Sequence, residues 1–99
     1  MKIIWMPRAK TDLNNILDYL NDNWSKREAE KFVIKVSKAI EQIKMSPETF
    51  PVVRKKKNIH KFLLVKQNTI YYRIQKNEIE LLTIWDTRQN PKKLKLNRE

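Results

Sequence analysis

The chain has 99 residues, about the size of one small domain, and its 22 Lys and Arg residues against 11 Asp and Glu residues give a net charge of +11. It contains no Gly, no Cys and one His. This composition excludes glycine-rich phosphate loops, disulfides, thiolate nucleophiles, Cys-based zinc sites and multi-His metal sites. We therefore expect no metal and no cofactor, and any chemistry depends on Lys, Arg, carboxylates and aromatic side chains.

The first segment predicts a short strand followed by a helix. Residues 2–5 are β-branched or aromatic after the first lysine, and Pro7 suits the first turn of a helix. Apolar side chains then recur on one helical face from about residue 7 to residue 22. The apolar run before Pro7 is too short for a signal peptide, and no stretch is long enough to span a membrane. Together with the absence of Cys, this favours a cytoplasmic protein that does not bind membranes.

A second helix is predicted from Ser25 to about residue 45. Ser25 and Glu28 have the spacing of a capping box, and the helix is expected to end before Ser46 and Pro47. The short polar turn between the two helices predicts an antiparallel helical hairpin. Each helix has one apolar stripe, so we expect the hairpin to pack on a sheet.

The second half of the chain predicts a basic loop and three strands. Residues 46–58 contain two prolines and the basic run Arg54–Lys57. β-branched and aromatic residues then predict strands at about 59–66, 69–75 and 79–86. The polar, basic tail of residues 87–99 contains Pro91, which excludes a continuing central strand. The whole chain, residues 1–99, is thus expected to form one α+β domain with the order β-α-α-β-β-β.

Two-residue turns are expected at Gln67-Asn68 and Lys76-Asn77, where Asn tolerates a positive φ in the absence of Gly. These turns place Arg73 opposite Glu80 and fix which side chains share a face. The face expected to meet the helices carries Leu63, Val65, Ile70, Tyr72, Ile74, Ile79 and Leu81. The opposite face carries Phe62, Leu64, Tyr71, Arg73, Glu80, Leu82 and Ile84.

Two stretches near the end of the chain are distinctive: residues 70–74 (Ile-Tyr-Tyr-Arg-Ile) and residues 84–91 (Ile-Trp-Asp-Thr-Arg-Gln-Asn-Pro). Together with the opening strand and the order of elements, they resemble the RelE/ParE superfamily of bacterial toxins over residues 2 to about 94. These are the toxin halves of type II toxin–antitoxin systems. The resemblance implies a helical hairpin packed on a mostly antiparallel, twisted sheet. It also implies a hetero-oligomer with a cognate antitoxin, whose acidic or amphipathic C-terminal segment wraps around the toxin and neutralises it.

The superfamily contains two activities, and this chain is more similar to one of them. RelE-like members cut messenger RNA on the ribosome, whereas ParE-like members poison DNA gyrase. Arg88 matches an arginine of the nucleases, but Thr69 and Leu94 stand where those enzymes have a second arginine and a Tyr or His. Lys61 and the run Arg54–Lys57 are loose counterparts of their lysines. The resemblance is therefore closer to the ParE-like branch, which implies a toxin that inhibits growth by binding an essential target.

Two alternatives remain open at this point. The first is a metal-independent, ribosome-dependent endoribonuclease, in which Arg88 stabilises the phosphate and His60 or a lysine transfers protons. The second is a basic module that binds nucleic acid and is not toxic. The candidate residues for binding a target or a nucleic acid are Arg54, Lys55, Lys56, Lys57, Lys61, Arg73, Arg88, Lys92 and Lys93.

Several of these candidates also have a structural interpretation. Arg88 is a candidate phosphate ligand, but it is also placed to pair with Asp86. Tyr71 and Arg73 are candidate antitoxin contacts, and Tyr71 is the aromatic residue expected to be exposed. The alternative for Arg73 is a cross-strand pair with Glu80 alone. His60 is expected in an exposed strand position.

The three tryptophans, Trp5, Trp24 and Trp85, are interpreted as packing residues rather than as platforms for stacking bases.

Overall fold

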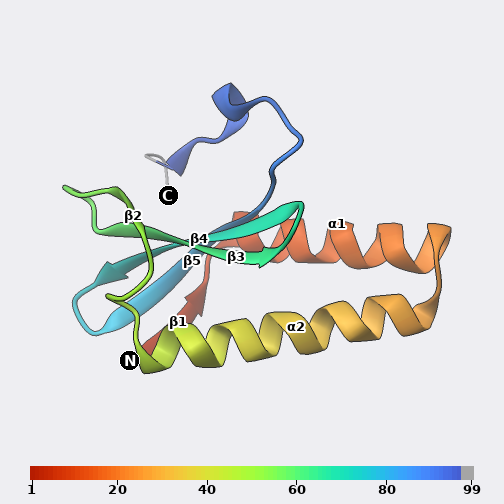
Figure 1. The fold of residues 1–99 in the computed structure, drawn as a ribbon, viewed down its shortest axis with the longest axis horizontal. Coiled ribbons are helices and arrows are strands. Elements are labelled where there is room, and N and C mark those ends of the chain that lie inside the picture. The colour runs from red at the N-terminus through yellow and green to blue at the C-terminus, as the bar shows by residue number, and fades with distance from the viewer. Residues whose placement is uncertain (97–99) are drawn as a thin grey trace.

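The computed structural model describes residues 1–96, which form two helices, five strands and a short 3-10 helix (Figure 1). The elements are β1 (Lys2–Trp5), α1 (Pro7–Asn23), α2 (Lys26–Met45), β2 (Val52–Arg54), β3 (Ile59–Val65), β4 (Asn68–Gln75), β5 (Glu78–Asp86) and η1 (Pro91–Lys93). Neither helix is both long and apolar enough to cross a membrane. The expected α+β fold is confirmed.

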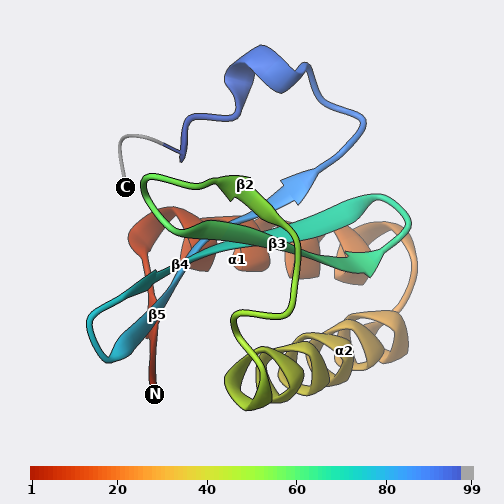
Figure 2. The same cartoon turned by 60° about the vertical axis from the view of Figure 1, so that its left-hand side comes forward.

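The two helices form the predicted hairpin. Pro7 occupies the first position of α1, and the Ser25 hydroxyl accepts a hydrogen bond of 3.2 Å from the Glu28 amide at the start of α2. The hairpin covers one face of the sheet, and the C-terminal segment crosses the other face (Figures 1 and 2). The core between helices and sheet contains Ala9, Ala39 and Ile43 from the helices.

The sheet has the strand order β1-β5-β4-β3-β2. β1 pairs with β5 in parallel, and the other neighbours are antiparallel. The chain between these two parallel strands contains the helical hairpin and then β2, β3 and β4, so the hairpin connects the two opposite edges of the sheet, β1 and β2. β2 was not predicted: residues 46–58 were expected to form a loop. Because this edge strand has three residues and pairs irregularly with β3, its sequence is too short to show an alternating pattern.

The predicted pairing of β3 with β4 is wrong by three residues. Leu63 was expected opposite Tyr72, but it pairs with Thr69, and the turn is Lys66-Gln67. An odd shift exchanges the two faces of a strand. Phe62 and Leu64 therefore pack against the helix-side core, whereas Leu63 is 66% exposed.

The pairing of β4 with β5 is correct until a β-bulge. Arg73 lies opposite Glu80 and Tyr72 opposite Leu81, as the two-residue turn predicts, but beyond them Tyr71 pairs with Thr83. The bulge reverses the alternation, so Ile84 joins the helix-side core instead of the opposite face. The predicted helix-side residues that are confirmed are Ile70, Tyr72, Ile74, Ile79 and Leu81.

The positive-φ residues are also different from those expected. Asn58 (φ 52°) and Lys76 (φ 56°) have the left-handed conformation, and neither Asn68 nor Asn77 does. Asn58 lies in the turn between β2 and β3, and Lys76 lies in the turn between β4 and β5.

The C-terminal segment packs on the sheet face opposite the helices. Leu96 is buried against Ile59 and Leu82, with Leu94 and Tyr71 packed around them. The expectation that Tyr71 is exposed is therefore wrong, and burial raises the pKa of its phenol. Residues 97–99 of the predicted tail lie outside the described residues.

Candidate functional site

A groove opens at the end of the molecule where the two helices are joined. Its volume is about 680 Å³, and its lining comes from α1, α2, the turn between β3 and β4, and the end of β5. Two aromatic side chains lie exposed along it: Trp24 is 70% exposed and Tyr19 is 59% exposed. The other apolar lining residues are Ile16, Leu20, Phe32, Val65 and Ile84. Large exposed aromatic side chains around an apolar hollow are typical of a binding surface.

The charged residues that line this groove are mostly acidic. Asp12, Glu28 and Asp86 contribute carboxylates, and Arg88 contributes the one guanidinium. The Asp12 carboxylate accepts hydrogen bonds from the Thr83 hydroxyl and, at 3.1 Å, from the Ile84 amide. It thus ties α1 to β5 just after the bulge.

The Arg88 side chain is exposed but already has a partner. Its Nε donates to Asp86 Oδ1 at 3.0 Å and its Nη2 donates to Asp86 Oδ2 at 2.8 Å. The side chain is 72% exposed, compared with 27% for Asp86. These hydrogen bonds hold the pKa of the Asp86 carboxyl below its usual range, and the same contact raises the pKa of Arg88. The structural interpretation of Arg88 is thus confirmed, and its role in binding remains a prediction.

His60 is buried, so the expectation of an exposed histidine is wrong. It is 1% exposed, and its ring stacks on Tyr72 with centroids 5.4 Å apart. Its Nδ1 donates to the Phe50 carbonyl at 2.7 Å, and its Nε2 lies 2.9 Å from Asn58 Oδ1. Tyr72, the neighbour of His60, lies on β4 four residues from Asn68, which is about 13 Å along a strand. Asn68 in turn pairs with Asp86, the partner of Arg88. The structure therefore does not bring His60 and Arg88 together.

The basic run lies at the opposite end of the sheet. Residues 55–58 form the turn between β2 and β3, and the side chains of Arg54–Lys57 are exposed. A shallow hollow of about 390 Å³ separates this turn from Lys76, and Arg73 lines it as well. Arg73 forms the predicted ion pair with Glu80, with Nη2 and Oε1 2.6 Å apart.

The remaining basic candidates lie elsewhere. Lys61 is exposed on β3, and Lys92 and Lys93 are exposed on η1. The nine basic candidates thus do not form one surface. Within residues 1–96, no cluster of three or more His, Cys, Asp or Glu side chains could hold a metal ion.

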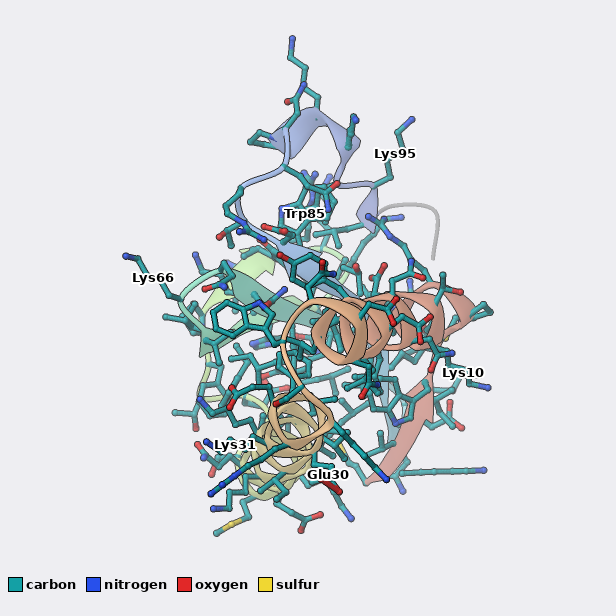
Figure 3. All side chains as sticks on the ribbon, turned by 90° about the vertical axis from the view of Figure 1, so that its right-hand side faces the viewer. Lys10, Glu30, Lys31, Lys66, Trp85 and Lys95 are labelled. Atoms are coloured by element: carbon teal, nitrogen blue, oxygen red, sulfur yellow. The ribbon has the colours of Figure 1, made fainter. Side chains whose placement is uncertain are left out.

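The tryptophans differ in their surroundings. Trp5 packs against the helix-side core. Trp85 is 6% exposed, has the Arg8 guanidinium 5.5 Å above its ring, and lies between α1 and the C-terminal segment (Figure 3). Trp24 was expected to be a packing residue, and this is wrong because it lies exposed in the groove. Sequence reasoning therefore missed both Trp24 and Tyr19. The sequence signal that could have found them is their position at the polar C-terminal end of α1, next to the short turn that joins the two helices.

Comparisons with known proteins identify the type of protein that this chain resembles. Residues 3–91 match the family model of the ParE toxin of the type II toxin–antitoxin system parDE. No curated protein matches the sequence.

Solved structures share the fold at low sequence identity. A chain of the chromosomal ParDE TA system from P. aeruginosa has a TM-score of 0.74 and 18% identity over 87% of this chain and 95% of its own length. The YoeB/ParE toxin from Agrobacterium tumefaciens has a TM-score of 0.63 and 14% identity over 87% and 98%. The YoeB dimer from Staphylococcus aureus has a TM-score of 0.58 and 16% identity over 86% and 94%. At these identities the likeness shows a common fold.

Proposed function

The chain belongs to the ParE toxin family of type II toxin–antitoxin systems, and from this premise we propose that it arrests bacterial growth by binding an essential target. We further propose that this target is DNA gyrase and that a cognate antitoxin neutralises the toxin by occupying the groove. The gyrase target follows from the resemblance to the ParE-like branch. The groove itself supports the other two parts of the proposal.

The charge around Arg88 is the main observation that favours target binding over RNA cleavage as the function. The groove contains three carboxylates beside one guanidinium, and that guanidinium is already paired with Asp86. A phosphodiester entering the groove would meet net negative charge and would have to displace Asp86 from Arg88. His60, the other catalytic candidate, is buried among Phe50, Asn58 and Tyr72. Leu94, which stands where the nucleases have a Tyr or His, packs with the apolar cluster under the C-terminal segment.

The same groove suits an amphipathic segment of an antitoxin. Trp24 and Tyr19 offer exposed aromatic surface, and aromatic residues commonly supply most of the binding energy of an interface. The carboxylates favour basic or neutral side chains on the partner where it meets Asp12 and Glu28, while Arg88 can exchange Asp86 for a partner carboxylate. The main antitoxin contact is therefore proposed at the groove, and Tyr71 and Arg73 stay candidates for further contacts.

Induced expression in a bacterium tests the toxin and its neutralisation. We expect growth arrest on induction and relief when the small protein encoded by the adjacent reading frame is expressed with it. Good soluble expression without arrest would contradict the toxin role. Arrest without relief by that protein would contradict its assignment as the antitoxin.

Two reactions with the purified toxin separate the possible targets. We expect it to inhibit DNA supercoiling by gyrase and to leave messenger RNA intact on stalled ribosomes. Normal DNA supercoiling by gyrase in the presence of the toxin would contradict the gyrase target. Cleavage of messenger RNA that is lost in Arg88→Ala would support the endoribonuclease alternative instead.

A further inference from the structure

Two turns at the end of the sheet remote from the groove form a basic surface. The turn of residues 55–58 and the turn at Lys76-Asn77 lie at the left in Figure 1, and the loop between the helices lies at the right. The Ile74 amide donates to the Asn58 carbonyl at 3.1 Å, which joins the first turn to β4. Both turns line the hollow of about 390 Å³. We call this surface the basic end, and its exposed cationic side chains are Arg54, Lys55, Lys56, Lys57 and Lys76.

These five cations have no acidic partner in the part of the chain that the structure describes. The ion pairs there are Lys31–Glu28, Arg73–Glu80 and Arg88–Asp86. Of the carboxylates on β5 near the basic end, Glu80 is thus bound to Arg73, and Glu78 is half-buried opposite Gln75. The basic end therefore carries a net positive charge in solvent, which attracts a polyanion.

The backbone of the basic end is held in place. The Asn58 amide group donates to the Ile74 carbonyl at 3.3 Å, and the Asn58 backbone N–H donates to the Lys55 carbonyl at 3.2 Å. Lys76 has a φ of 56°, a conformation that costs a residue other than Gly or Asn about 1 kcal/mol. Strain of this kind concentrates at functional sites. Here it places a lysine beside the turn that already carries Lys56 and Lys57.

We propose that the basic end binds the phosphate backbone of duplex DNA. Among the described residues, the exposed aromatic side chains Tyr19 and Trp24 lie at the groove, so the basic end offers no platform on which unpaired bases could stack. Lysines contact phosphates as point charges and do not read bases. Ile74, the apolar residue of the hollow, is 8% exposed, so the surface has little to hold a peptide. The choice of DNA over RNA rests on the proposed gyrase target.

Fluorescence anisotropy with a short duplex DNA of random sequence tests this proposal. The variant Lys55→Gln/Lys56→Gln/Lys57→Gln/Lys76→Gln is compared with the matched control Lys10→Gln/Lys26→Gln/Lys35→Gln/Lys38→Gln, which removes the same number of exposed charges from the helices. Each lost phosphate contact lowers the slope of log affinity against log salt by about 0.9. We expect the basic-end variant to lose on the order of 100-fold in affinity at low salt and most of the slope. The helix variant should keep most of both.

Other outcomes overturn the proposal. Equal losses in the two variants would mean that binding follows overall charge rather than the basic end. Tighter binding of a duplex RNA of the same sequence, or equal binding of polyglutamate, would assign the surface to RNA or to an acidic protein. If the protein does not bind DNA but still arrests growth, and co-expression of the antitoxin still relieves the arrest, only the inference about the basic end is overturned. DNA binding without growth arrest would leave this inference standing and overturn the proposed toxin role.

Discussion

The two ends of β4 present opposite kinds of surface. At the Asn68 end, the groove exposes Trp24 and Tyr19 beside carboxylates. At the other end, the turns expose lysines with little apolar area around them. Apolar side chains in water favour association with a protein partner, whereas unpaired cations favour a polyanion. We infer from this difference that one small sheet positions two binding surfaces of different chemistry.

Each end is fastened by one polar side chain that bonds to the backbone of a neighbouring strand. Asp12 binds the Ile84 amide at the groove end, and Asn58 binds the Ile74 carbonyl at the basic end. If the two surfaces are independent, removal of either of these hydrogen bonds should destabilise the nearer end of the sheet first.

Asn58→Ala should lower the free energy of unfolding by about 3 kcal/mol. Alanine in the left-handed conformation costs about 1–2 kcal/mol, and the loss of the amide removes the partner of His60 Nε2, which leaves a buried polar atom without a hydrogen bond. Urea unfolding measures the loss. Asn58→Gly keeps the backbone conformation and removes only the side-chain bonds, so it should lose less. Equal losses in the two variants would contradict the contribution of the positive φ.

Asp12→Ala should lower the free energy of unfolding by about 2 kcal/mol, because the Thr83 hydroxyl and the Ile84 amide lose their acceptor. Asp18→Ala on the exposed side of the same helix is the control and should change stability by less than about 0.5 kcal/mol. Urea unfolding of the three proteins measures both. A similar stability of all three would show that Asp12 does not fasten the groove end.

Trp24→Ala should weaken binding of the antitoxin by about 30-fold, or about 2 kcal/mol, without a change in fold stability, because its side chain is exposed in the free protein. Met45→Ala is the matched control, since Met45 is 82% exposed and does not line the groove. Calorimetric titration with the protein from the adjacent reading frame measures both. Equal affinities of the two variants would place the antitoxin elsewhere.

Lys76→Asn should raise the free energy of unfolding by about 0.5–1 kcal/mol, because Asn tolerates the positive φ. The same substitution removes one cation of the basic end, so DNA affinity should fall while stability rises. Thermal unfolding and anisotropy on one preparation give both values. A fall in stability would contradict the assignment of strain to this turn.

The smallest expected effect is a pH dependence at the groove end. Hydrogen bonds from Arg88 lower the pKa of Asp86 in the folded protein. The Asp86 carboxylate therefore adds to the free energy of unfolding above the usual aspartate pKa of about 3.9. This added stability is lost as the pH falls through the lower pKa of the folded protein. Asp86→Asn should therefore be slightly less stable than the parent at neutral pH and equal to it in strong acid. A stability difference that does not change with pH would contradict this contribution.

Local patterns predicted the helices and the near-neighbour pairs well. Periodicity and capping predicted α1 to within one residue of Pro7–Asn23 and the start of α2 after Ser25. The pairs Arg73–Glu80 and Arg88–Asp86 follow from a short turn and a two-residue spacing. These features depend on residues close together in the chain.

The features that were missed depend on distant parts of the chain. The bulges beside Leu63 and Tyr72 change the register without a signal in the alternation of side chains. The groove exists only because the helical hairpin and the end of β5 meet, and the burial of His60 depends on Phe50. Charge counting similarly could not show that the basic residues are divided among separate surfaces.

The most direct test of two separate surfaces is a crossed titration of two variants against two ligands. The variants are Trp24→Ala and the quadruple basic-end variant, and the ligands are the antitoxin from the adjacent reading frame and the random-sequence duplex DNA. We predict that Trp24→Ala loses affinity for the antitoxin alone and that the basic-end variant loses affinity for DNA alone. A variant that keeps the parent's stability and loses affinity for both ligands would contradict the separation of the two surfaces.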